Sequence, residues 1–159
     1  MFDNGHAQNL SRNECLRLLS HARLGRLVVI ADALPAVHPV LFRVDDTDDD
    51  AVVVRLSAES PWIPAIHNQV VAFHVDDIDI DTQTGWSVSG VGQATLITDV
   101  ADLARVSSLY PTTAAPPGAS LIRIPLCLIH GQRIRSYPRD LAPEASSTGP
   151  FRDCKEFRG

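Results

Sequence analysis

The sequence has almost no lysine and only three scattered cysteines. Lys155 is its single lysine, and 19 acidic residues outnumber 14 basic ones. The net charge of −5 and the lack of a basic stripe make nucleic acid and anionic membranes poor candidates for partners. Cys15, Cys127 and Cys154 form no Cys-x-x-Cys pair, which argues against a disulfide framework and fits a reducing compartment.

No apolar run is long enough to cross a membrane. The longest runs, such as Leu27–Ala31, have the length of a strand. The first ten residues lack the basic and apolar regions of a secretion signal, so we expect a cytoplasmic protein. At 159 residues, with 45% hydrophobic and 21% charged residues, the chain has the size and composition of one globular domain.

Common motifs of catalytic and metal sites are also missing. The sequence has no Walker loop, no Gly-x-Ser-x-Gly elbow and no dinucleotide fingerprint. The Asp-rich segments 45–50 and 76–81 lack the glycine and glutamate spacing of a calcium loop. His74 and Asp76 share one face of a predicted strand, but no third ligand stands at a recognised spacing. We therefore predict no metal site and assign no catalytic residue.

Three helices and six strands are predicted along the chain. Ser11 and Glu14 form a capping-box pattern that begins an N-terminal helix ending near Gly25. A short helix follows Pro61, and Asp99 is the expected N-cap of a helix over 100–109. Strand-like hydrophobic patterns occur at Leu27–Ala31, Val37–Val44, Val52–Leu56, Val70–Val75, Gly85–Leu96 and Leu121–Ile134, the last interrupted at Pro125.

The short links between these strands favour a mostly antiparallel sheet closed into a small barrel. We expect one domain over residues 11–136, between a flexible N-terminus (1–10) and a C-terminal tail or dimer arm (137–159). Residues 76–84 are predicted to form a polar loop. Gly90 and Gly92 permit a bend or a close approach of another backbone segment.

The stretch Ala51–Val75 is the best candidate for a ligand site. It is predicted to form a strand, a Ser-rich turn, a short helix and a second strand. Backbone N–H groups at such a turn, together with Arg55, Ser57 and Ser60, can bind a phosphate. An ordinary cap at a surface strand end explains the same residues equally well. Trp86 fits a core or dimer-interface aromatic better than a residue that stacks on a ligand.

Several segments, taken in order, resemble the pyridoxamine 5′-phosphate oxidase-like family of FMN-binding split barrels. The closer likeness is to its branch of nitroimidazole-reductase-like proteins. The resemblance covers about Leu10 to Ile134. It rests on Leu24-Gly25-Arg26-Leu27, His38-Pro39-Val40-Leu41-Phe42, Arg55-Leu56-Ser57-Ala58, Val71–Asp76, Gly85-Trp86-Ser87-Val88, Ser89–Ala94, Ile122-Arg123-Ile124-Pro125 and Gly131-Gln132-Arg133.

The resemblance implies a six-stranded antiparallel split β-barrel that forms a homodimer and binds FMN between its subunits. It further implies an oxidoreductase acting on a small molecule, in which the flavin carries the redox chemistry. The strand matching Val37–Phe42 lies along the flavin ring, and the segment matching Arg55–Trp62 holds the phosphate. The implied cofactor-binding residues are Pro39, Val40, Leu41, Phe42, Arg55, Ser57, Ser60, Trp62, Trp86 and Ser87.

One position departs from the family pattern. Trp62 stands where relatives usually have a phosphate-binding lysine, and Glu59 adds a negative charge nearby. Loss of one charge-assisted contact predicts FMN binding weaker by about tenfold or more. Arg55 can compensate only if its side chain points toward the turn, which strand alternation leaves open. The alternatives are a non-catalytic dimeric barrel that holds a deazaflavin coenzyme or haem, or one with an empty pocket.

Overall fold

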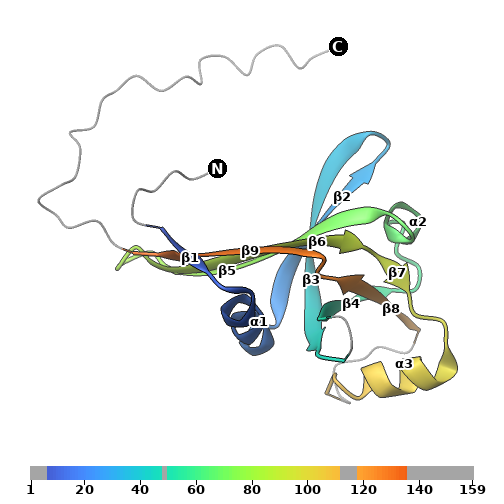
Figure 1. Cartoon of the computed structure of the whole chain (residues 1–159). Helices are drawn as coiled ribbons and strands as arrows, with labels where there is room; N and C mark the ends of the chain where they lie inside the picture. The colour runs from blue at the N-terminus through green and yellow to red at the C-terminus, as the bar shows by residue number, and fades with distance from the viewer. Residues whose placement is uncertain (1–6, 48–49, 112–117, 136–159) are drawn as a thin grey trace, which may run out of the picture.

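One antiparallel sheet and three helices make up the computed structural model, which describes residues 7–47, 50–111 and 118–135 (Figure 1). The helices are α1 (Arg12–His21), α2 (Ile63–Ile66) and α3 (Val100–Ser107). The strands are β1 (Gln8–Leu10), β2 (Leu24–Ala31), β3 (Leu34–Asp45), β4 (Ala51–Ser57), β5 (Val70–Asp79), β6 (Thr84–Gln93), β7 (Thr95–Leu96), β8 (Ala119–Pro125) and β9 (Leu128–Ile134).

The strand order within the sheet is β1-β9-β6-β5-β2-β3-β4-β8-β7, with every neighbouring pair antiparallel. The sheet curls so that β6 also approaches β8. A Cβ added to Gly92 of β6 would lie only 1.8 Å from the Pro125 carbonyl oxygen of β8. This is the close backbone approach that the sequence predicted for Gly92, and the curled sheet confirms the predicted split barrel.

The inward-facing side chains of the curled sheet form the main hydrophobic core. Phe42 and Phe73 lie at its centre, both fully buried, with ring centroids 4.8 Å apart in an edge-to-face arrangement. Helix α1 packs Cys15 and Leu19 onto this core. The predicted capping box begins the helix, since the Ser11 side chain accepts from the Glu14 N–H and the Glu14 carboxylate accepts from the Ser11 N–H.

Helix α3 covers the outer face of β4 and β8 and creates a second, smaller core (Figure 1). Asp99 caps it as predicted, accepting from the Asp102 N–H at 2.8 Å. The buried residues of this core are Val53, Ile97, Val106, Tyr110 and Leu121.

The described residues contain nine strands, three more than the sequence predicted. β1 lies within residues 1–10, which we expected to be flexible, and pairs with β9. β7 is a two-residue strand after β6, and the interruption at Pro125 separates β8 from β9. Residues 76–79 extend β5 instead of beginning a loop, because their backbone pairs with β6 from Thr84 to Ser87.

The predicted tail over residues 137–159 lies outside the described residues. Within the part of the chain that the structure describes, the helices are too short or too polar to span a membrane.

Candidate functional site

The sheet has an exposed apolar surface on the side of β9, β6, β5, β2 and β3 that faces away from the barrel core. Strand register places one residue from each of five adjacent strands in a row across it. Val37 is 58% exposed, and at the end of the sheet near the β2–β3 turn Val70 is 67% exposed. Contiguous exposed apolar surface of this kind marks an interaction site. We call this surface the outward face, and its central row consists of Leu128, Val91, Ala72, Val28 and Val37.

A polar row lies beside the apolar one on the outward face. Asp76 accepts a hydrogen bond from Arg26 and lies 3.3 Å from His74 Nε2. The other ring nitrogen of His74 is 2.9 Å from the Ser89 hydroxyl. His74 and Asp76, considered above as possible metal ligands, are therefore engaged by Arg26 and Ser89 as well as by each other.

The four predicted flavin-contacting residues of β3 divide between two faces of the strand. Val40 and Phe42 are buried in the barrel core, so only their backbone can reach a ligand. Pro39 and Leu41 point the other way and belong to the outward face. On β6, Ser87 shares the outward face, while Trp86 packs against the main core, as the simpler of its two interpretations predicts.

The Ser-rich turn is stabilised by hydrogen bonds of its own. The Ser60 N–H donates to the Ser57 carbonyl at 2.9 Å. The Ser57 hydroxyl accepts from the Glu59 N–H and the Ser60 hydroxyl from the Trp62 N–H, each at a long 3.4 Å. Because these two bonds are weak, both hydroxyls can reorient toward a ligand. No lysine or arginine lies within the turn itself.

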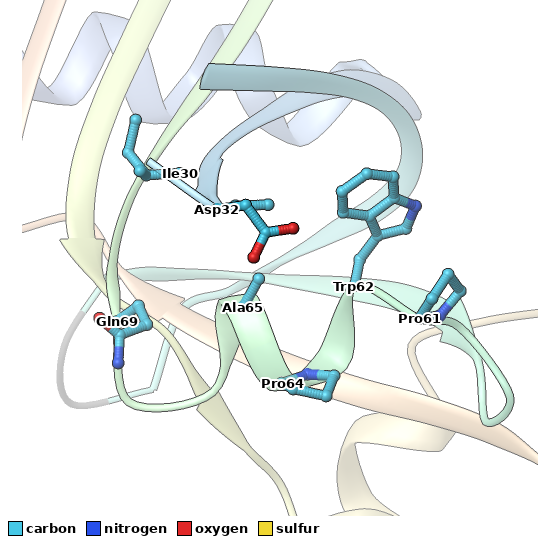
Figure 2. Close-up of a pocket in the computed structure, with 8 residues that line it drawn as sticks. Ile30, Asp32, Pro61, Trp62, Pro64, Ala65 and Gln69 are labelled. Atoms are coloured by element: carbon cyan, nitrogen blue, oxygen red, sulfur yellow. The ribbon is translucent and has the colours of Figure 1, made fainter. Parts of the chain in front are cut away.

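A pocket of about 530 Å³ opens beside Trp62, between α2 and the β2–β3 turn (Figure 2). This volume is in the range of small-molecule sites. The indole ring stands at one side of the pocket, with Pro61 beyond it and the Asp32 carboxylate facing Ala65 (Figure 2). The pocket is lined by Ile30, Ala31, Asp32, Pro61, Trp62, Pro64, Ala65 and Gln69.

The rings of His38 and Trp62 pack together in a tilted arrangement, with their centroids 4.0 Å apart. The His38 Nε2 atom is buried and has no hydrogen-bond partner among the described residues. The sequence named Trp62 as a site residue and placed His38 on the strand expected along the flavin ring, but it did not place the β2–β3 turn at the pocket. Asp32 and Ala33 form that turn in left-handed backbone conformations, with φ of 52° and 63°. The turn was predicted, but its position beside α2 depends on the curl of the sheet.

Arg55 points away from the Trp62 pocket. Its guanidinium lies over the Tyr110 ring, 5.3 Å from the centroid, at the end of α3. The Tyr110 hydroxyl donates to the Val53 carbonyl at 2.6 Å, and burial raises the pKa of Tyr110 to about 12. The ring is therefore neutral at physiological pH. The structure thus separates Arg55 from Trp62, although the sequence grouped them in one phosphate site.

Comparisons with known proteins identify the family. The family model described as pyridoxamine 5′-phosphate oxidase matches residues 11–125. The uncharacterized protein Rv0080 of Mycobacterium tuberculosis is 38% identical over 109 residues, which cover 63% of this chain and 67% of that protein. The nitroimidazole-reductase-like branch stays a prediction.

Two solved structures extend this likeness to the fold. The FAD binding protein from Mycobacterium smegmatis is 31% identical, with a TM-score of 0.69 over 80% of this chain and 100% of that chain. A conserved protein of unknown function, DIP1874 from Corynebacterium diphtheriae, is 25% identical, with a TM-score of 0.68 over 80% and 98% of the two chains. The chain therefore belongs to the pyridoxamine 5′-phosphate oxidase-like family of FAD- and FMN-binding split-barrel proteins.

Proposed function

We propose that this protein binds a flavin nucleotide as a homodimer and uses it to exchange electrons with a small molecule. The observation that carries the proposal is the 31% identity to the FAD binding protein of M. smegmatis, all of whose length is covered. When bound, the flavin supplies the redox chemistry, while the chain positions it and limits its contact with water.

The outward face and the Trp62 pocket fit the flavin ring. Pro39 and Leu41 offer an apolar strand surface, and Ile30 belongs both to this face and to the wall of the pocket. Asp32 and Gln69 add polar groups to the lining of the pocket. Apolar walls with a few polar groups are typical of cofactor sites.

The chain offers fewer contacts to the phosphate end of the flavin than to its ring. The turn provides the Ser57 and Ser60 hydroxyls and backbone N–H groups, but Trp62 replaces the usual lysine and Glu59 repels an anion. FMN and FAD share the first phosphate and differ only in the nucleotide that FAD carries beyond it, so contacts of this turn with the first phosphate do not distinguish the two cofactors. We infer that binding depends more on ring contacts than on phosphate contacts.

A partner subunit on the outward face would complete the ring site. The exposed apolar row would be buried against a second copy of the same face, as a two-fold interface requires. This arrangement would also cover a flavin ring that otherwise lies open to solvent on one side.

The test is titration of flavin-free protein with FMN and with FAD, followed by quenching of flavin fluorescence. Trp62→Lys restores a cation at the turn and is expected to tighten FMN binding by about tenfold. Trp62→Met is the matched control, because it removes the ring without adding charge. Equal gains in both variants would show that the indole obstructs the site and that the missing charge is not the cause.

An absorbance spectrum of freshly purified protein separates the alternatives. A flavin spectrum supports the proposal, and a Soret band would indicate haem instead. A colourless protein that binds neither FMN nor FAD at hundreds of micromolar would overturn the proposal. A deazaflavin coenzyme is then the next ligand to titrate.

A further inference from the structure

A second, smaller cavity lies on the other side of the Ser-rich turn, between α3, β4 and β8. It has a volume of about 180 Å³, and its described lining residues are all different from those of the Trp62 pocket. Whole-ligand sites are usually larger, so this cavity can hold only a small group or one end of a ligand. It is lined by Arg55, Leu103, Ser107, Tyr110, Gly118, Ala119 and Leu121.

Among the described residues, Arg55 is the only charged one that lines this cavity. Its Nη1 atom is buried and has no hydrogen-bond partner within the described part of the chain. A buried donor that carries positive charge is costly to leave without an acceptor. Stacking on Tyr110 compensates the charge in part but accepts no hydrogen bond in the guanidinium plane.

The neighbouring Arg43 differs from Arg55, because its guanidinium has hydrogen-bond acceptors. Arg43 also lies over the Tyr110 ring, 5.0 Å from its centroid, yet its guanidinium donates to the Leu109 and Phe42 carbonyls at 3.1 and 2.7 Å. Arg43 and Arg55 lie on adjacent strands and share one face, with no carboxylate paired to either among the described residues. The positive charge at this position is therefore not neutralised by those residues.

The other polar groups of the cavity complement an anion. Ser107 is among the lining residues, and a serine hydroxyl can donate to an oxyanion. Tyr110 adds an apolar ring wall, since its hydroxyl hydrogen is committed to the Val53 carbonyl. A planar guanidinium with a free edge binds phosphate or carboxylate through two parallel hydrogen bonds.

We propose that the cavity between α3 and β4 is an oxyanion site in which Arg55 binds a phosphate or carboxylate group. The anion belongs either to the flavin of the proposed function or to a separate small molecule. Both sources are geometrically reasonable, since Arg55 pairs in register with Leu41 on the strand expected to lie along the flavin ring. The site itself depends on the described residues and not on flavin binding.

Inorganic phosphate is the probe. Its affinity for flavin-free, full-length protein is measured by calorimetric titration and by the rise in Tm, against chloride at matched ionic strength. Arg55→Gln is expected to weaken phosphate binding at least tenfold. Arg17→Gln, which removes the same charge from an exposed position of α1, is expected to bind phosphate like the natural protein. If Arg55→Gln does not fold, Ser107→Ala serves as the second variant and is expected to weaken binding several-fold.

Equal phosphate affinity in the natural protein and both arginine variants, or no binding in any of them, would overturn the proposal. A Tm rise common to all variants reports only the general exclusion of phosphate from protein surfaces. Titration with FMN then identifies the source. A tenfold loss of FMN affinity in Arg55→Gln supports the site as one for the flavin phosphate. Unchanged FMN affinity, or no FMN binding in any variant, with phosphate binding still dependent on Arg55, supports a site for a separate anion.

Discussion

At the scale of single residues, Gly92 shows how little space the barrel closure leaves. An added Cβ would meet the Pro125 carbonyl oxygen at 1.8 Å and its carbon at 2.9 Å. Both atoms belong to the backbone of β8, which cannot rotate away as a side chain can. Any side chain at position 92 therefore forces β6 and β8 apart.

Gly92→Ala is expected to lower the free energy of unfolding by about 3 kcal/mol, the upper end of the usual cost of overpacking. Urea unfolding followed by tryptophan fluorescence measures the change. Gly118→Ala is the control, because an added Cβ there meets no described residue within 4 Å, although the φ of Gly118 is +83°. Its expected loss is only about 1 kcal/mol, from backbone strain. If both variants lose the same unfolding free energy, the close contact between β6 and β8 is not what makes Gly92 necessary.

The direction in which the Arg55 side chain points could not be predicted from the local sequence. Alternation along β4 puts Val54 and Leu56 on one side and Arg55 on the other, but which side faces the core depends on distant segments. The Tyr110 ring that attracts Arg55 follows α3, far along the chain, and no local pattern links the two. The sequence identified Arg55 as an anion-binding candidate, while its separation from Trp62 required the structure.

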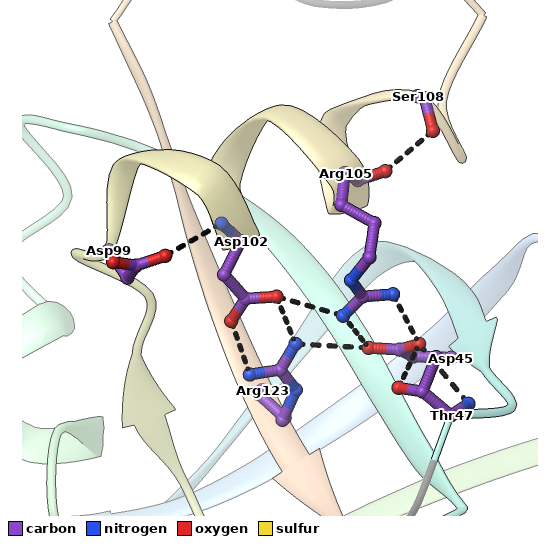
Figure 3. A network of polar contacts seen from close by, with 7 residues as sticks. All are labelled: Asp45, Thr47, Asp99, Asp102, Arg105, Ser108 and Arg123. Atoms are coloured by element: carbon purple, nitrogen blue, oxygen red, sulfur yellow. Dashed lines mark hydrogen bonds and ion pairs between the residues drawn. The ribbon is translucent and has the colours of Figure 1, made fainter.

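At the scale of elements, α3 is attached to the barrel by an ion network (Figure 3). Asp45 at the end of β3 is only 2% exposed and accepts from Arg105, Arg123 and Thr47. Asp102 on α3 accepts from both arginines as well. Each arginine therefore bridges two carboxylates, and α3, β3 and β8 are held together at one point.

This network predicts how stability depends on pH. Hydrogen bonds from Arg105 hold the pKa of Asp45 well below its ordinary value of 3.8, and those from Arg123 lower the pKa of Asp102 to about 2. Because the folded state lowers both pKa values, its stabilisation is complete above the unfolded value and is lost as pH falls. We expect the free energy of unfolding to be level above about pH 5 and to decline from about pH 4 toward pH 2.

Asp102→Asn is expected to lower the stability at neutral pH by about 1 kcal/mol, since Asp102, Arg105 and Arg123 are partly exposed, and to make the acid decline shallower. Asp81→Asn, in the β5–β6 loop, should change neither quantity. Chemical unfolding at a series of pH values measures both. An acid decline of unchanged slope in Asp102→Asn would exclude this carboxylate as its source.

Elements defined by local signals were predicted well, and those defined by pairing were not. The capping box at Ser11 and the cap at Asp99 are contained within a few residues, so the sequence located both helices. β1 and the second half of β5 are polar and have no strand signal of their own. They are strands because β9 and β6 supply hydrogen-bond partners from elsewhere in the chain.

At the scale of the whole molecule, the outward face is an apolar surface that a single barrel leaves exposed to solvent. A single copy leaves Val37 and Ile30 more than half exposed beside the Trp62 pocket. A monomer gains nothing from such a surface, which raises the risk of aggregation. Two copies joined face to face would bury it and would border the predicted flavin site at the same time.

Val37→Asp is therefore expected to dissociate the proposed homodimer. In sedimentation experiments the natural protein should show twice the 17.3 kDa mass of one chain. A two-fold interface buries the new carboxylate twice, so the dimer should weaken by more than about a hundredfold. Val100→Asp, on α3 and 81% exposed, should leave the mass unchanged.

The same variant connects assembly with function. If the partner subunit covers the flavin ring, Val37→Asp should lose flavin affinity in step with its dissociation, and raising the protein concentration should restore both. Flavin affinity that does not depend on protein concentration in Val37→Asp would show that one chain holds the ring unaided. A natural protein that sediments as a monomer at tens of micromolar, and binds flavin there, would refute the dimer while leaving the flavin proposal intact.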